Sequence, residues 1–284
     1  MIETPTNEAQ LPQGRIRYRE LGTGEPIVLV HGLLTDSELW RAVLPRLAAD
    51  FRVIAPDWPL GSHELPLAPG ADLSPLGLAQ IIADFLGELE LEGVTLVGND
   101  TGGALCQLVA AHHPERLGRL VLTPCDAYEN FLPPAFRPLQ VLARVPGALF
   151  AVLQSMRAAP ARRAPLAYGW VTRRADDKLT RSWITPALSS RAIRRELAAF
   201  LTGISDRYTL EASEHFGEFA KPVLIAWAPE DRFFKLRYAE RLVDAFPHAR
   251  LELIEDSYTF VPIDQPERTA ELIAGFVREP ALSS

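Results

Sequence analysis

The chain has 284 residues, 48% of them hydrophobic and 23% charged, which is enough to bury the core of one large α/β domain. Its 29 Lys and Arg against 36 Asp and Glu give a net charge of −7, so no basic surplus exists for nucleic acid, and no nucleic-acid partner is expected. Two cysteines, Cys106 and Cys125, are too few for a disulfide framework or a zinc site.

The opening residues, 1–14, are polar and acidic and lack the basic flank and apolar stretch of a signal peptide. No apolar run in the chain reaches membrane-spanning length. We therefore expect a cytoplasmic protein with no membrane partner.

Strands and helices are expected to alternate through the first part of the chain. Apolar and β-branched runs predict strands at 15–21, 26–30, 51–57, 94–97 and 117–123. Helical spacing of apolar residues predicts helices at 40–49, 76–88 and 104–111. This alternation predicts an α/β fold with a doubly wound, mostly parallel sheet.

The alternation breaks between residues 126 and 220, a helix-like stretch crowded with prolines and paired arginines. It resumes with a strand at 221–227, a helix at 236–246, a strand at 250–254 and a helix at 266–277. We therefore expect residues 1–125 and 221–284 to form one core and residues 126–220 to be a helical cap inserted into it. The arginine pairs of the insertion are most simply explained as a solvated face.

The most informative segment is Gly98-Asn99-Asp100-Thr101-Gly102-Gly103, between a predicted strand and a predicted helix. A strand, a glycine-flanked turn and a helix form the arrangement that exposes a reactive side chain at the top of a sheet. The glycines fit because strand and helix approach too closely there for side chains. Here the apex is Asp100, and a carboxylate nucleophile attacks a saturated, electrophilic carbon to leave an ester on the enzyme. Taken alone, the segment also fits an aspartate that caps a helix.

Together these segments resemble the α/β-hydrolase superfamily, specifically its aspartate-nucleophile branch of epoxide hydrolases and haloalkane dehalogenases, over nearly the whole chain. The resemblance implies an α/β-hydrolase fold with Asp100 as nucleophile and Asp231, in the segment Ala226–Asp231, as the acid. His31-Gly32 matches the family's oxyanion loop, so the backbone N–H groups of Leu33 and Thr101 would form the oxyanion hole. No cofactor is implied, and no metal-ligand spacing stands out.

One position departs from the family pattern. Where the family has a Gly-His-Phe-type segment that supplies the catalytic base, this chain reads Tyr258-Thr259-Phe260, with Thr259 in the histidine position. A threonine hydroxyl is not a general base near neutral pH. His63 lies in a loop at the carboxyl edge of the sheet, where ligands bind in such folds, and is the candidate substitute base.

Other residues are expected around the site. His31 is expected to order the oxyanion loop, and Asp126 to serve either as an alternative acid or as a hinge residue of the cap. The residues expected to line the site are His31, Trp58, Asp126 and Tyr128.

The residues expected around the nucleophile indicate the class of substrate. The halide-binding tryptophan of dehalogenases is absent, because Thr101 follows Asp100. Epoxide opening needs tyrosines from the cap, and Tyr128, Tyr168 and Tyr208 lie in the insertion. A small apolar substrate with epoxide hydrolase-like chemistry is therefore favoured over halide displacement, and a homodimer remains open. Two alternatives to hydrolysis stay open: a lyase or isomerase with Asp100 as general base, and a ligand-binding protein that has lost hydrolysis.

Overall fold

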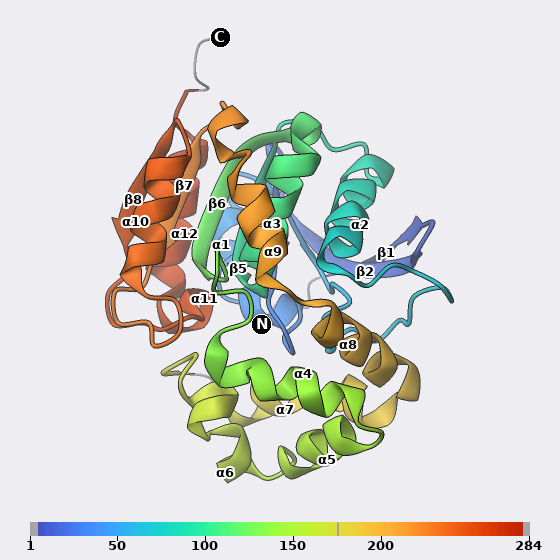
Figure 1. Ribbon diagram of the computed structural model, residues 1–284. Coiled ribbons are helices and arrows are strands. Elements are labelled where there is room, and N and C mark those ends of the chain that lie inside the picture. The colour runs from blue at the N-terminus through green and yellow to red at the C-terminus, as the bar shows by residue number, and fades with distance from the viewer. Residues whose placement is uncertain (1–4, 175, 281–284) are drawn as a thin grey trace.

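An eight-stranded sheet forms the centre of the computed structural model, which describes residues 5–174 and 176–280 (Figure 1). The strand order is β1-β2-β4-β3-β5-β6-β7-β8. Strands β3 to β8 run parallel, whereas β1 and β2 form an antiparallel hairpin that joins the sheet at β4. The strands are β1 (Thr6–Leu11), β2 (Gly14–Leu21), β3 (Pro26–Val30), β4 (Arg52–Pro56), β5 (Val94–Asp100), β6 (Leu117–Cys125), β7 (Val223–Trp227) and β8 (Ala249–Leu253). The predicted mostly parallel sheet is confirmed.

Helices cover both faces of the sheet (Figure 1). One face carries α2 (Pro75–Glu88), α3 (Thr101–His112), α9 (Asp206–Ser213) and α10 (Leu236–Ala245). The other carries α1 (Leu44–Leu47) and α12 (Pro266–Val277), which contact each other, and the short α11 (Val261–Asp264) precedes α12. Burial on both faces explains why the central strands are apolar without alternation.

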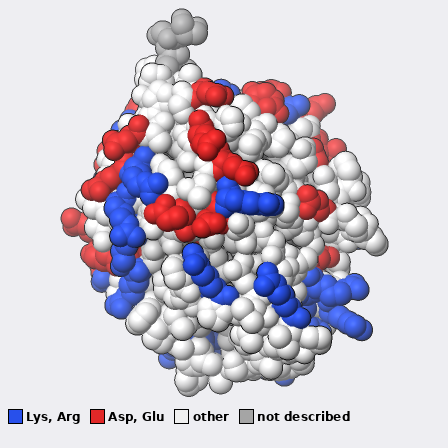
Figure 2. Space-filling view, in the orientation of Figure 1, with Lys and Arg blue, Asp and Glu red and all other residues white. Residues whose placement is uncertain are grey.

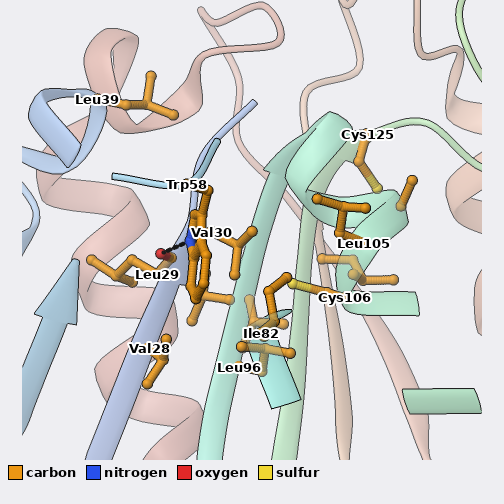
Figure 3. Close-up of a cluster of buried hydrophobic side chains, with 14 of the residues drawn as sticks. Val28, Leu29, Val30, Leu39, Trp58, Ile82, Leu96, Leu105, Cys106 and Cys125 are labelled. Atoms are coloured by element: carbon orange, nitrogen blue, oxygen red, sulfur yellow. Dashed lines mark hydrogen bonds between the residues drawn. The ribbon is translucent and has the colours of Figure 1, made fainter. Parts of the chain in front are cut away.

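Part of the core lies where β5 packs against α3 and α3 packs against α2. Figure 3 shows Ile82 of α2, Leu96 of β5 and Cys106 of α3 close together there, and the Trp58 indole N–H donates to the Leu29 carbonyl at 3.2 Å. All these side chains are buried, and the thiols of Cys106 and Cys125 are free. This rigid core fixes the carboxyl ends of the strands, from which the site is built.

A layer of short helices lies beyond the carboxyl edge of the sheet, in the lower part of Figure 1. It comprises α4 (Arg137–Arg144), α5 (Ala148–Ser155), α6 (Ala159–Arg162), α7 (Asp177–Ser189) and α8 (Arg191–Gly203), all between β6 and β7. We call α4 to α8 the cap helices. Prolines near their first turns keep several of them short, because a proline has no N–H to continue a helix from the preceding turn. Helix α9 follows the cap helices in the chain, but it packs against α3 of the core.

Two expectations about the elements were wrong. The predicted helix at 40–49 is a turn of 3₁₀ helix (Ser37–Trp40) followed by α1, because Pro45 has no N–H to bond back to residue 41. The spacing of apolar residues in this segment reflects burial and not a continuous helix, because Trp40, Leu44 and Leu47 all pack in the core. Strand β1 was not predicted, because only Ala9 and Leu11 of its six residues are buried. Residues 1–4 of the opening segment lie outside the described range.

Candidate active site

The turn between β5 and α3 holds Asp100 in a strained conformation. Its φ of 55° and ψ of −132° are values that a non-glycine residue rarely adopts. The turn is possible because the flanking backbone packs without side chains: a Cβ on Gly98 would lie 2.6 Å from the Cα of Gly103. Strain of this kind persists where the surroundings hold it, and it often marks a functional site.

The carboxylate of Asp100 lies against the oxyanion loop. The backbone N–H of Leu33 donates to Asp100 Oδ2 at 3.1 Å. Burial raises the pKa of Asp100 to about 7, against the lowering effect of backbone hydrogen bonds from Thr101 and Leu33. Only part of the side chain is exposed, and that part faces an apolar pocket. Near neutral pH this carboxyl is therefore poised between its acid and its ionised forms.

The ring of His31 orders the loop that carries Leu33. Its Nδ1 donates to the Gly32 carbonyl at 2.9 Å, and its Nε2 accepts from the backbone N–H of Trp58 at 2.8 Å. Burial lowers the pKa of His31 to about 4, so the ring is neutral and a single tautomer satisfies both bonds. The loop is thereby tied to the chain that follows β4, and the Leu33 N–H points at Asp100.

Asp231 and Thr259 form the second part of the site. Asp231 Oδ1 accepts from the backbone N–H groups of Phe233 and Phe234, each at 2.7 Å. Its Oδ2 accepts from the Thr259 hydroxyl, also at 2.7 Å. Burial raises the pKa of Asp231 to about 6. The acid thus keeps an oriented partner, but that partner is a hydroxyl whose proton is already committed to Asp231.

Asn99 anchors the backbone at Thr259. Its amide Nδ2 donates to the Thr259 carbonyl at 2.7 Å and to the Thr123 hydroxyl at 2.8 Å. The residue next to Asp100 therefore ties the elbow to the loop that carries Thr259. No local pattern in the sequence predicts this link, because the two residues are 160 positions apart.

The pocket above Asp100 has a volume of about 110 Å³ and an almost entirely aliphatic and aromatic wall. Asp100 and Thr101 form its polar floor, and Tyr168 contributes the only other polar side chain among the described lining residues. The remaining wall comes from the two core loops and the cap helices: Leu33, Leu34, Leu132, Pro133, Phe136, Leu139, Leu149, Val152, Leu153, Met156, Leu166, Ala167, Val171, Leu201 and Phe260. No described lining residue is a histidine. An apolar pocket with a few convergent polar groups is typical of a small-molecule site.

Of the cap tyrosines, the structure brings one to the pocket. The Tyr168 hydroxyl donates to the Leu34 carbonyl at 2.7 Å, and burial raises its pKa. Tyr128 was expected to line the site, but its hydroxyl donates to the Arg241 carbonyl at 2.9 Å and its ring lies under the Arg241 guanidinium. The hydroxyl of Tyr208, in α9, accepts from Arg207 and does not line the pocket.

The structure does not bring His63 to Asp100. Its Nε2 bonds Glu196 Oε2 of α8 at 2.7 Å, and its Nδ1 accepts from the Gly61 N–H at 3.4 Å. Both ring nitrogens are engaged, and His63 does not line the pocket. Glu196 lies 133 positions from His63 in the sequence, so only the folded chain reveals this pairing.

Three other expected lining residues, His31, Trp58 and Asp126, lie behind the pocket wall. Asp126 is fully buried, and its Oδ2 accepts from the Thr101 hydroxyl at 3.3 Å. Burial and the nearby charge of Asp100 raise the pKa of Asp126 well above its usual value. Within residues 5–174 and 176–280, no group of three metal-ligating side chains is placed to hold an ion.

Comparison with known proteins identifies relatives of this chain. The profile of the family described as "alpha/beta hydrolase fold" matches residues 25–266. An uncharacterized protein of Mycobacterium tuberculosis is 30% identical over 99% of this chain and 84% of its own length. Haloalkane dehalogenase 2 of the same organism is 28% identical over 92% of this chain and 91% of its own. The solved structure of the epoxide hydrolase CorEH superposes with a TM-score of 0.79 at 18% identity, covering 96% of this chain and 98% of that one, which bears on the fold alone.

Proposed function

This chain belongs to the α/β-hydrolase fold family, and we propose that Asp100 is its nucleophile, attacking a saturated carbon of a small apolar electrophile. The observation that carries the proposal is the hydrogen bond from the Leu33 N–H to Asp100 Oδ2 at the floor of the apolar pocket. With Oδ2 held in this way, Oδ1 is the oxygen available for attack. The relation to haloalkane dehalogenase 2, over nearly its whole length, supports the same class of chemistry.

The first step is then an in-line displacement. A bond forms between Asp100 Oδ1 and the electrophilic carbon, while the bond from that carbon to its leaving group breaks and the leaving group takes the electron pair. Oδ2 becomes the carbonyl oxygen of the resulting ester. It lies against the backbone donor that would stabilise negative charge there when water attacks, a contribution of roughly 3–4 kcal/mol per donor.

Among electrophiles, the pocket favours an epoxide over an alkyl halide. A departing halide needs N–H donors from tryptophan or asparagine side chains, and neither residue type is among the described residues lining the pocket. An epoxide oxygen needs a proton, and Tyr168 supplies a hydroxyl in the pocket once its bond to the Leu34 carbonyl is exchanged.

The second step, hydrolysis of the ester, is expected to be slow. In the relatives' pattern a histidine beside the acid takes the proton of the attacking water. Here that position is Thr259, whose proton is donated to Asp231, and no histidine lines the pocket within the described residues. We therefore expect the ester on Asp100 to accumulate.

Intact-protein mass measurement tests this proposal. The protein is incubated at pH 8 with small terminal epoxides and with primary alkyl halides, and product is assayed in the same tubes. The expected result is a mass increase equal to the mass of the epoxide, located on Asp100 by peptide mapping. In Asp100→Asn the adduct should form at least about 10³-fold more slowly. Asp126→Asn is the matched control, because Asp126 is a buried carboxyl that does not line the pocket; it should keep the adduct. No adduct and no product with any reagent would overturn the proposal.

A second candidate function is proton transfer, with Asp100 as general base of a lyase or isomerase. The pKa of about 7 favours it, because a carboxyl of that pKa gives and accepts protons readily at neutral pH. Under this alternative, turnover proceeds without a mass adduct, and deuterium from solvent enters the substrate or product. The adduct measurement separates the two candidates directly.

A further inference from the structure

The charges of this protein are distributed unevenly between core and cap. Residues 130–204 contain twelve Lys and Arg but only three Asp and Glu, although acidic residues outnumber basic ones, 36 to 29, in the whole chain. In Figure 2 the red acidic side chains gather on the upper part, over the core, whereas the lower part, over the cap helices, is mostly white and blue. The cap is therefore a basic surface on an acidic protein.

The outer side of helix α4 combines this charge with exposed apolar residues. Arg137, Val141 and Arg144 follow each other at helical spacing, are all exposed, and share one side of the helix with Val145 just after it. The exposed fractions of Val141 and Val145 are 60% and 50%. Neither arginine makes an ion pair with a described acidic residue. An apolar patch of this kind on a soluble domain commonly marks an interaction surface.

The same helix also forms part of the pocket wall. Leu139, on the inner side of α4, lines the pocket, whereas Val141 on the outer side faces solvent. Leu166 both lines the pocket and is 58% exposed, so it marks the place where the pocket reaches the surface. A helix with a basic and apolar outer side thus helps to enclose an apolar cavity. We define the docking face as Arg137, Val141, Arg144 and Val145.

We propose that the docking face binds peripherally to the surface of an anionic lipid bilayer. Arginines flanked by aliphatic side chains on one side of a helix are the pattern of interfacial helices, in which the charges contact acidic headgroups and the apolar side chains enter the headgroup region. The acidic core is repelled by the same surface, which orients the cap toward it. The pocket that α4 helps to line would then lie close to the bilayer, in which apolar molecules dissolve.

Other partners fit the docking face less well. Nucleic acid bases are bound by stacking on aromatic side chains, and the exposed apolar residues here are aliphatic. An acidic protein satisfies the charges but gives no reason for an apolar cavity beneath the same helix. The expectation of no membrane partner rested on the lack of a signal-peptide pattern and of a membrane-spanning run in the sequence. Among the described residues no helix is long and apolar enough to cross a membrane, and surface binding requires none.

Vesicle co-sedimentation of the full chain tests the proposal. The vesicles contain phosphatidylcholine alone or with 30% phosphatidylserine, a choice of composition that provides a zwitterionic and an anionic surface, at low and physiological salt. The expected result is binding to the anionic vesicles that weakens as salt rises, with little binding to phosphatidylcholine alone. Equal binding to both compositions, or none to either at low salt, would overturn the proposal.

Two pairs of variants sharpen this test. Arg137→Glu/Arg144→Glu should weaken binding to anionic vesicles at least tenfold, and Val141→Ser/Val145→Ser should also weaken it, because both charge and insertion contribute. Arg15→Glu/Arg278→Glu makes the same change of charge on exposed core residues and should bind like wild type. Thermal unfolding monitored by circular dichroism checks that each variant is folded. Wild-type binding by both docking-face variants contradicts the proposal, and so does retention on an acidic polypeptide column without vesicle binding, which would assign the face to an acidic protein.

Discussion

The two halves of the candidate active site differ in what they retain. Around Asp100, the strained elbow, the ordered His31 loop and the Leu33 donor supply what the proposed attack on carbon requires. Around Asp231, the carboxylate is equally well held, yet its partner Thr259 has no basic nitrogen. Under the proposed mechanism the first half forms the ester, and the second half lacks the group that would hydrolyse it.

This contrast shows that a residue can satisfy the hydrogen bond of a buried acid without being able to act as a base. The Asp231–Thr259 bond of 2.7 Å satisfies the buried acid as well as a histidine would, so the fold loses no partner at this position. Stability therefore does not require the histidine, and only the second step of the reaction does. The predictions below test each half separately.

The largest effect is expected from Thr259→His. A ring nitrogen beside Asp231 restores a base for water, so the lifetime of the ester on Asp100 should shorten by about 10²- to 10⁴-fold. The measurement is the decay of the adduct mass after removal of excess reagent. Thr259→Val is the matched control, since it removes the hydroxyl without adding a base, and its adduct should persist. Equal lifetimes in the two variants would show that the missing histidine does not limit the second step.

A smaller effect is expected from Gly32→Ala, which disturbs only the first half of the site. A Cβ at this position would lie 2.1 Å from Asp100 Oδ2, so the carboxylate must move from its place against the Leu33 N–H. Adduct formation should slow by about 100-fold, because displacement of a nucleophile by about 1 Å has effects of this size. Gly217→Ala, where the added Cβ meets nothing within 4 Å, should leave the rate unchanged. An unaffected Gly32→Ala would argue that Asp100 does not act from this position.

The pH dependence of adduct formation should report the pKa of Asp100. Only the ionised carboxylate attacks, and burial raises its pKa to about 7. The rate should therefore rise about tenfold per pH unit below pH 7 and level off above it. Initial rates between pH 5 and pH 9, with a reagent that does not itself titrate, provide the measurement. A rate that is constant from pH 5 upward would mean that the carboxyl is ionised throughout.

The smallest effect concerns stability. Because folded Asp100 holds its proton up to about pH 7, whereas the unfolded chain releases it near pH 4, the native protein loses stability as pH rises through this window. Asp100→Asn removes the charge, so it should be more stable than wild type at pH 8 by about 1–2 kcal/mol, a fraction of the full linkage. At pH 4, where the folded Asp100 carboxyl is protonated and therefore neutral like the asparagine amide, the difference should nearly vanish.

Urea unfolding at the two pH values measures this difference. Asp244→Asn, at an exposed position of α10, serves as control and should change stability little at either pH. A less stable Asp100→Asn at pH 8 would contradict the raised pKa.

The sequence by itself determined the features that depend on a few neighbouring residues. The elbow is readable because the close approach of strand and helix demands glycines around Asp100, and the central strands because burial on both faces demands unbroken apolar runs. The threonine in the histidine position was equally visible. These constraints act over a few residues, so they leave a local pattern.

The walls and partners of the site were decided only by the tertiary structure. Three tyrosines of the insertion were equivalent in sequence, yet Tyr168 lines the pocket whereas Tyr128 and Tyr208 pack elsewhere. His63 stood at the expected edge of the sheet, but Glu196 of α8, far along the chain, engages its ring. Which side of a short cap helix faces the pocket depends on how the helices pack on one another. Such long-range contacts leave no local pattern, because a partner more than a hundred residues away places no constraint on the neighbouring residues in the sequence.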